Sequence, residues 1–209
     1  MKYKLINFDM DGTLIYRTTA HLFYSSVLGC QKQMARLEKG FSECEISYSV
    51  FARELQVLFK DLNLDIIDSN FGEMPKIGRI SDTIEYLRHR GFLVSIITSS
   101  GVHFANSFLK EYNMDFSAGS IHKINNGYIG ESKYLCTSQE KVKQLAAFAY
   151  SRGITLEECI SIGDSYTDLE LFNSVGMSIA LNAKPEIEPL ATTSIRTDNL
   201  TEIIPLLEL

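Results

Sequence analysis

Apolar residues in the second part of the chain alternate between short continuous runs and stretches with helical spacing. Residues 92–98, 159–163 and 177–181 are short apolar runs, which predict buried strands. Helical spacing covers 80–90, 102–112, 138–152 and 166–173, with a weak strand at 192–196 and a weaker helix at 199–207. Residues 3–9 supply one more strand, so this alternation predicts an α/β fold with a parallel sheet covered on both faces.

Residues 17–74 have a different pattern. Phe51, Leu55, Leu58 and Leu62 recur at spacings of four, three and four, which places them on one face of a helix. Shorter helices are expected at 21–28 and 34–37, whereas Gly40 and residues 63–72 interrupt the pattern. The block has no proline, so we expect an inserted helical domain between the first strand and the rest.

Two local signals refine these boundaries. Asn126-Gly127, between Ile124 and the apolar pair at 128–129, predicts a β-hairpin. Ser81 or Asp82 is expected to cap the helix at 80–90, and Gly91 is expected to end it.

Composition excludes several classes of protein. The 209 residues are 45% hydrophobic and 22% charged, as in a folded globular chain, and the net charge of −6 without a basic run argues against nucleic-acid binding. The cysteines at 30, 44, 136 and 159 have neither zinc nor redox spacing, so we expect reduced thiols. Asp9 interrupts the first apolar stretch, and no run reaches the roughly 18 residues of a membrane span. We expect a soluble cytoplasmic protein without a membrane partner.

Polar clusters follow three of the predicted strands. Residues 9–13 read Asp-Met-Asp-Gly-Thr, residues 98–101 read Thr-Ser-Ser-Gly, and residues 163–168 read Gly-Asp-Ser-Tyr-Thr-Asp. In an open parallel sheet, ligands bind at the carboxyl ends of the strands, so these clusters should meet at one edge. Neither a dinucleotide fingerprint nor a phosphate loop of the Gly-Lys-Ser/Thr type is present.

The chemistry of these clusters favours phosphoryl transfer. Carboxylates that converge on one site repel one another, and a hard divalent ion such as Mg²⁺ relieves that repulsion. The four acidic candidates are Asp9, Asp11, Asp164 and Asp168. Taken singly, each feature has a structural interpretation: a helix cap at Asp164, a turn at Asp11-Gly12, and a solvated helix residue at Lys141. The functional interpretation depends on their joint occurrence at strand ends.

These motifs resemble those of the haloacid dehalogenase superfamily of phosphohydrolases. Residues 9–13 match its first motif, Thr98 its second, Lys141 its third, and Gly163-Asp164 with Asp168 its fourth. Residues 152–158 and 182–185 also look like its phosphoserine phosphatase-like branch. The resemblance implies a three-layer αβα Rossmann-like parallel sheet with an inserted helical-bundle cap. The core would comprise residues 1–13 and 78–209, and the cap residues 14–77.

The resemblance also implies a role for each site residue. Asp9 would be the nucleophile that forms an aspartyl-phosphate, and Asp11 the general acid and base. Mg²⁺ would be held by Asp9, Asp164 and the backbone carbonyl of Asp11. Phosphate oxygens would be held by Thr98, Ser99 and Thr167, with Lys141 neutralising charge and Asp168 orienting the lysine and the metal site. Lys143 is the fallback for the third motif.

The expected function is a magnesium-dependent phosphatase acting on a small phosphorylated metabolite, as a monomer or homodimer. Phosphoserine phosphatase proper and a phosphotransferase or phosphomutase stay as alternatives. A dehalogenase is disfavoured because Asp11 is an acid that phosphoester cleavage needs. A signalling receiver lacks a helical insertion, and intact motifs argue against an inactive scaffold.

Substrate choice is expected to depend on the cap. Residues 17–20 read Arg-Thr-Thr-Ala, without the carboxylate that the branch uses for a substrate ammonium. Burying an unpaired ammonium is costly, so phosphoserine is expected to be a weak substrate. Arg17 and Arg53 are the cationic candidates, and Glu43 or Glu45 would be the source of negative charge if phosphoserine were preferred.

Overall fold

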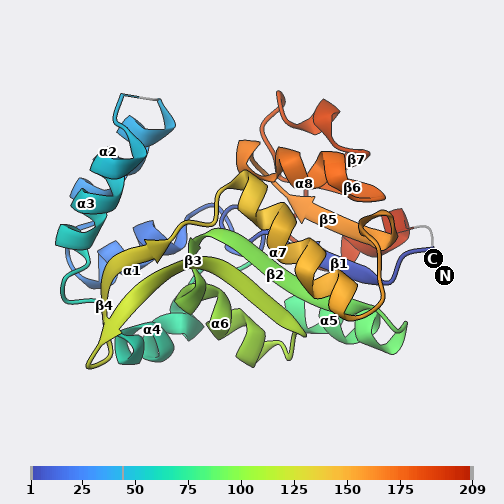
Figure 1. The fold of residues 1–209 in the computed structure, drawn as a ribbon, viewed down its shortest axis with the longest axis horizontal. Helices are drawn as coiled ribbons and strands as arrows, with labels where there is room; N and C mark the ends of the chain where they lie inside the picture. The colour runs from blue at the N-terminus through green and yellow to red at the C-terminus, as the bar shows by residue number, and fades with distance from the viewer. Residues whose placement is uncertain (1, 44, 208–209) are drawn as a thin grey trace.

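The computed structural model describes residues 2–43 and 45–207, which form a sheet of seven strands in the order β4-β3-β2-β1-β5-β6-β7 (Figure 1). Neighbouring strands are parallel except for the antiparallel hairpin of β3 and β4. The strands are β1 (Leu5–Phe8), β2 (Leu93–Gly101), β3 (Phe116–Asn125), β4 (Tyr128–Tyr134), β5 (Cys159–Gly163), β6 (Met177–Leu181) and β7 (Thr193–Ile195).

Helices cover both faces of this sheet. The α-helices are α1 (Ala20–Val27), α2 (Gln31–Ser42), α3 (Tyr48–Leu58), α4 (Leu64–Asn70), α5 (Ile80–His89), α6 (Val102–Glu111), α7 (Ser138–Ser151) and α8 (Leu169–Ser174). Short 3₁₀ helices are η1 (Phe71–Glu73), η2 (Leu156–Glu158), η3 (Tyr166–Asp168), η4 (Glu188–Leu190) and η5 (Leu200–Leu207).

Side-chain alternation along the strands explains the three layers. Ile6 and Phe8 of β1 face a core that α5, α6 and η5 complete, whereas Leu5 faces the opposite core, with Leu145 of α7 and Leu171 of α8. Successive strand residues point to opposite faces, so a strand buried on both sides must be apolar throughout. The predicted three-layer α/β fold is therefore confirmed.

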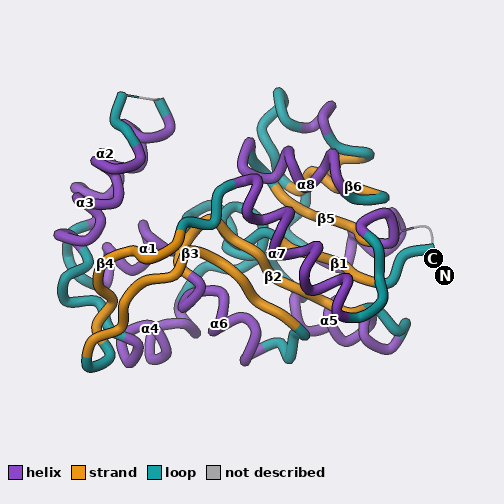
Figure 2. Tube along the Cα trace, in the orientation of Figure 1, coloured by secondary structure: helices purple, strands orange, loops and turns teal. Residues whose placement is uncertain are grey.

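Helices α1, α2 and α3 lie at the left of Figure 1, at the end of the molecule toward which β3 and β4 extend. The chain enters and leaves this region side by side, because Tyr16 donates its N–H to the Pro75 carbonyl and Ile77 donates to Leu14. The β3–β4 hairpin runs toward the same region (Figure 2), where Ile129 donates to the carbonyl of Leu62. The division into a cap of residues 14–77 and a core of 1–13 and 78–209 stays a prediction.

Several predicted elements are accurate. β5 and β6 match the predicted runs residue for residue, and the hairpin turns at Asn126 and Gly127, whose φ angles are 51° and 84°. Positive φ at both central residues belongs to a type I′ turn, for which Asn-Gly is favoured.

Three sequence-based expectations are wrong. Gly40 lies inside α2, where one glycine costs only about 1 kcal/mol. Residues 64–70 form α4 because the Asn63 side chain accepts from the Ile66 N–H and caps the helix. Helix α5 starts after Arg79, in left-handed conformation at φ 63°, and Asp82 pairs with Arg79 instead of capping.

The final segment and the cysteines complete the comparison. Residues 200–207 lie where a helix was expected but form a 3₁₀ helix that contains Pro205. Cys30, Cys136 and Cys159 are free thiols, as expected, whereas Cys44 lies outside the described residues. Within the described ranges, every helix is too short or too polar to cross a membrane.

Candidate active site

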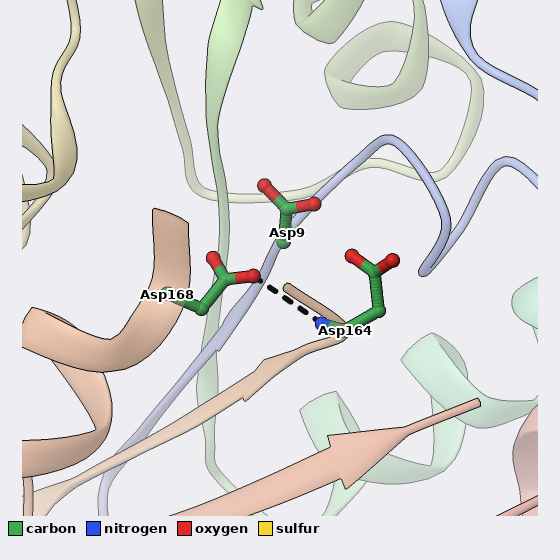
Figure 3. Close-up of side chains that lie close together, drawn as sticks. All are labelled: Asp9, Asp164 and Asp168. Atoms are coloured by element: carbon green, nitrogen blue, oxygen red, sulfur yellow. Dashed lines mark hydrogen bonds between the residues drawn. The ribbon is translucent and has the colours of Figure 1, made fainter. Parts of the chain in front are cut away.

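Two neighbouring parallel strands, β1 and β5, bring the residues that follow them to one edge of the sheet. Asp9 follows β1, Asp164 follows β5, and Asp168 ends η3, which comes next along the chain. The three carboxylates each offer an oxygen within 4.8 Å of the others, and Figure 3 shows them grouped at this edge. Three of the four carboxylates expected to converge therefore do so, whereas the Asp11 side chain is not a member of this group.

Lys141 lies at the centre of this group. Its fully buried Nζ donates to Oδ1 of Asp9 at 2.6 Å, to Oδ1 of Asp168 at 2.8 Å and to the Thr167 hydroxyl at 3.3 Å. Burial acts to lower the pKa of Lys141, but the charges of Asp168 and Asp9 outweigh it and raise the pKa, so the ammonium stays charged. Lys143, the fallback, is exposed and pairs with Glu140.

Asp168 acts as a fixed anchor for the loop after β5. Its Oδ1 faces Lys141, and its Oδ2 accepts from the backbone N–H groups of Asp164 and Ser165 at 3.2 and 3.3 Å (Figure 3). Both oxygens are thus engaged, which leaves Asp9 and Asp164 as the members of the group with oxygen atoms to spare.

Asp9 and Asp164 are held in an environment short of positive charge. Burial, followed by the charge of Asp168, raises the pKa of Asp9 well above its usual value and raises the pKa of Asp164 to about 7. Oδ1 of Asp164 is buried and accepts no hydrogen bond from the described residues. The Asp164 carboxylate also packs on Gly12, where a β-carbon would overlap it. The site offers oxygen ligands, carries an excess of negative charge, and has a buried carboxylate oxygen that accepts no hydrogen bond from the described residues. These properties fit a hard divalent cation.

Asp11 is oriented by two hydrogen bonds from different elements. Oδ1 accepts from the Ala20 N–H at the start of α1, and Oδ2 accepts from the Ser100 hydroxyl at the end of β2, both at 2.6 Å. This arrangement fixes both oxygens of the half-buried carboxylate at the mouth of the acidic group.

The end of β2 contributes hydroxyl groups. The Thr98 hydroxyl accepts from the Ser100 N–H at 3.0 Å, and its own proton has no acceptor in the part of the chain that the structure describes. The hydroxyls of Ser99 and Thr13 are buried and have no hydrogen-bond partner among the described residues. Buried polar groups are normally paired, so these donors suit an anion bound beside Asp9.

A cavity of about 1160 Å³ opens over this edge. The core contributes Asp9, Asp11, Thr98, Ser99, Asp164 and Thr167, while the helical region contributes Arg17, Thr19, His21, Glu38, Phe41 and Phe51. Arg17 lines the cavity, and its guanidinium stacks on Tyr16. Arg53 instead borders a smaller adjoining cavity, and its largely exposed side chain pairs with Glu54.

Sequence reasoning missed Glu38, a carboxylate in the cavity. Its Oε1 accepts from the Thr19 hydroxyl at 2.7 Å and lies 3.8 Å from Nδ1 of His21. Burial raises the pKa of Glu38 to about 7. Its position on α2, 19 residues beyond Thr19, gave no local signal, and the considered alternatives Glu43 and Glu45 are not among the residues that line the cavity.

Known proteins with similar sequences differ in how much of their own length this chain covers. A phosphoserine phosphatase of Methanocaldococcus jannaschii is 25% identical over 206 residues, which cover 97% of both chains. Phosphoserine phosphatases of Streptomyces coelicolor and Archaeoglobus fulgidus are 23% and 24% identical across nearly all of this chain, which spans 50% and 60% of their lengths.

Solved structures show the same fold. A phospho-aspartyl intermediate analogue of phosphoserine phosphatase superposes with a TM-score of 0.82 at 24% identity, and a substrate-bound phosphoserine phosphatase complex with 0.84 at 22%; each match covers 99% of both chains. The family model of the haloacid dehalogenase-like hydrolases matches residues 6–173, which include all four motifs but not residues 182–185. The chain belongs to the haloacid dehalogenase-like hydrolase family.

Proposed function

We propose that the protein is a magnesium-dependent phosphatase that hydrolyses a small phosphate monoester through an aspartyl-phosphate on Asp9. The observation that carries this proposal is the state of Asp9: Lys141 engages its Oδ1, and no described residue donates to its Oδ2. A buried carboxylate with one oxygen neutralised and the other facing a cavity suits nucleophilic attack on phosphorus.

The proposed reaction has two halves. Oδ2 of Asp9 forms a bond to phosphorus while the ester P–O bond breaks, and Asp11 gives its proton to the leaving oxygen. Water then attacks the aspartyl-phosphate, Asp11 accepts the proton of that water, and inorganic phosphate leaves with Asp9 restored.

Other groups hold the phosphoryl oxygens. Lys141 remains charged beside the nucleophile, and the unused hydroxyl protons of Thr98 and Ser99 point to phosphate binding. Thr167, which already contacts Lys141, borders the same space. Mg²⁺, held by Asp9, Asp164 and the Asp11 carbonyl, would screen the approach of the carboxylate to an anionic substrate.

A phosphate-release screen tests this proposal. The protein is incubated with a panel of phosphorylated metabolites and Mg²⁺, and inorganic phosphate is measured with and without a chelator. We expect release from at least one monoester that stops on chelation. Lack of release across the panel would contradict the proposal, and transfer of the phosphoryl group to an added alcohol in place of release would indicate a phosphotransferase.

Phosphoserine is a second candidate substrate, and Glu38 favours it. The sequence-based expectation that phosphoserine is weak assumed that no cap carboxylate reaches the site, whereas Glu38 lines the cavity beside Thr19. A carboxylate there would pair with a substrate ammonium. The relatives that carry the name phosphoserine phosphatase also support this candidate.

Comparison of two esters decides between these expectations. We propose to measure kcat/KM for phosphoserine and for ethyl phosphate, which lacks the ammonium, in the wild type and in Glu38→Gln. If Glu38 binds the ammonium, the variant loses activity only on phosphoserine. Equal kcat/KM values for the two esters in the wild type would show that the ammonium adds nothing to recognition. That result would support the sequence-based expectation that another monoester is preferred.

A further inference from the structure

Ser100 makes a contact that the proposed chemistry does not yet use. Its hydroxyl donates to Oδ2 of Asp11 at 2.6 Å, across 89 residues of sequence. Neither residue is fully buried, and both line the cavity over the acidic group. The contact thus joins the end of β2 to the turn after β1, at the side chain proposed to move protons.

The end of β2 is shaped to deliver this hydroxyl. The pairing of β2 with β3 shifts register between Ile97 and Gly101, and the Ser100 N–H bonds back to the Thr98 hydroxyl. The carbonyl of Ser99 is held by the Ser120 hydroxyl at 2.7 Å. Register irregularities next to active sites re-aim side chains, and here the irregular stretch directs Ser100 toward Asp11.

The two hydrogen bonds to Asp11 differ in kind. The Ala20 N–H can only donate, so Oδ1 is confined to the role of acceptor. The Ser100 hydroxyl donates to one lone pair of Oδ2, and the other lone pair of that oxygen is left for the proton that Asp11 transfers. Oδ2 can therefore release and regain a proton while the hydrogen bond from Ser100 holds the carboxyl group in its orientation.

We propose that Ser100 is a positioning residue for Asp11, which holds the carboxyl group in the orientation that delivers a proton to the leaving oxygen. This inference rests on the proposed function, because Asp11 must be the general acid. It predicts that the benefit of Ser100 depends on how much the leaving group needs a proton.

Two aryl esters of nearly equal shape provide the test. Nitrophenolate departs from 4-nitrophenyl phosphate without protonation, whereas phenyl phosphate has a more basic leaving group. The quantity to measure is kcat/KM, because it reports the steps up to release of the alcohol and excludes hydrolysis of the aspartyl-phosphate. Ser100→Ala removes the hydroxyl, Ser100→Thr keeps it, and Ser117→Ala removes a hydroxyl on β3 that bonds to Asn106.

The expected loss in Ser100→Ala is about 10–100-fold on phenyl phosphate, since misplacing a catalytic group costs on that order, and within about threefold on 4-nitrophenyl phosphate. Ser100→Thr should restore the wild-type ratio of the two rates, and Ser117→Ala should not change it. An equal loss on both esters, no loss on either, or a threonine variant that behaves like alanine would overturn the inference.

A crystal structure of Ser100→Ala provides a readout that does not need activity. We expect the Asp11 carboxylate to turn away while its neighbours Asp9 and Asp164 stay in place. An unmoved Asp11 would overturn the inference even in an active enzyme. A wild type that releases no phosphate from either ester would instead contradict the proposed function, and the orientation of Asp11 would still decide the role of Ser100.

Discussion

The Asp9 side chain experiences two opposing influences. Lys141 neutralises one oxygen at 2.6 Å, while burial and the charge of Asp168 act to keep the group uncharged. Neutralising Asp9 should therefore reduce the repulsion among the carboxylates. Lys141 would keep a charged partner, because its Nζ also donates to Oδ1 of Asp168 at 2.8 Å.

Asp9→Asn should abolish phosphate release and leave the fold intact. An amide lacks the anionic oxygen that attacks phosphorus, so a loss of about 10³-fold or more is expected by comparison with other nucleophile replacements. Phosphate release measures the activity, and circular dichroism with thermal unfolding checks the fold. A rate within about tenfold of the wild type would show that another group is the nucleophile.

Glu38 should make the stability of the protein depend on pH. Its pKa is about 7 in the folded protein, against an ordinary value of 4.5, so the folded state binds more protons than the unfolded state between these values. The free energy of unfolding should therefore fall as pH rises from about 4.5 to 7, by at most about 3 kcal/mol from this group.

Glu38→Gln should remove this dependence. Glutamine keeps an acceptor for the Thr19 hydroxyl, so the variant should match the wild type near pH 5 and be more stable at pH 8. Urea unfolding at several pH values measures the difference. Because other groups titrate equally in both proteins, a difference between them that does not change with pH would refute the assignment.

For single residues, the sequence was informative where a polar side chain ends an apolar run. Asp9, Thr98 and Asp164 could be placed because each ends an apolar run. Glu38 could not be placed, and Ser100 was placed in the cluster at 98–101 but received no role, since both roles depend on tertiary contacts, across 19 and 89 residues. An isolated glutamate gives no local signal that separates a site residue from a solvated one.

Among the elements, the turn after β1 combines a left-handed glycine with a close contact to the site. Gly12 adopts a φ of 81°, and a β-carbon there would overlap the Asp164 carboxylate. Gly29, between α1 and α2, adopts a similar φ of 73° with open space around it. Comparing alanine substitutions at these two glycines therefore distinguishes the effect of backbone strain from the effect of displacing Asp164.

Gly12→Ala and Gly29→Ala should both be destabilised, by roughly 1–3 kcal/mol each from left-handed backbone strain. Only Gly12→Ala should also lose phosphatase activity, because Asp164 must move away from the position suited to a metal. Thermal unfolding and phosphate release measure the two effects. Equal activity in the two variants would mean that close approach of Asp164 to Gly12 is not needed for catalysis.

Elements buried on both faces were the most predictable. β5 and β6 are fully buried runs, and their boundaries follow from hydrophobicity alone. α4 was missed because Asn63 acts as a helix cap in a segment whose Asn and Gly content indicates a loop. α5 begins at Ile80 as predicted, but its cap was misassigned because Arg79 precedes the helix in a left-handed conformation that its residue type does not favour.

In the whole molecule, the site depends on sheet order. β1 lies between β2 and β5, although β5 is more than 150 residues away along the chain. Parallel strands share one direction, so their carboxyl ends must meet, and the motif order along the chain sufficed to predict the meeting of the acidic residues. The cavity shape depends on how α1, α2 and the β3–β4 hairpin approach the core, which no local pattern encodes.

Mg²⁺ should stabilise the whole protein as well as activate it. Burial and mutual repulsion leave Asp9 and Asp164 with raised pKa values, a cost that unfolding relieves and that a bound cation would offset. A ligand that binds only the folded state at 100 times its Kd adds about 2.7 kcal/mol, which corresponds to a rise in Tm of roughly 5–10 °C. Protons compete for the same oxygens, so the rise should be larger at pH 8 than at pH 6.

Thermal unfolding with and without Mg²⁺, beside phosphate release, checks this expectation. Chelation should abolish activity and Mg²⁺ should restore it, whereas Ca²⁺ should support it poorly because its coordination shell is larger and looser. Asp164→Asn provides the control, since it removes the carboxylate whose Oδ1 is unpaired and should lose most of the rise in Tm. Full activity after exhaustive chelation, together with a Tm that Mg²⁺ does not change, would exclude a metal at this edge of the sheet.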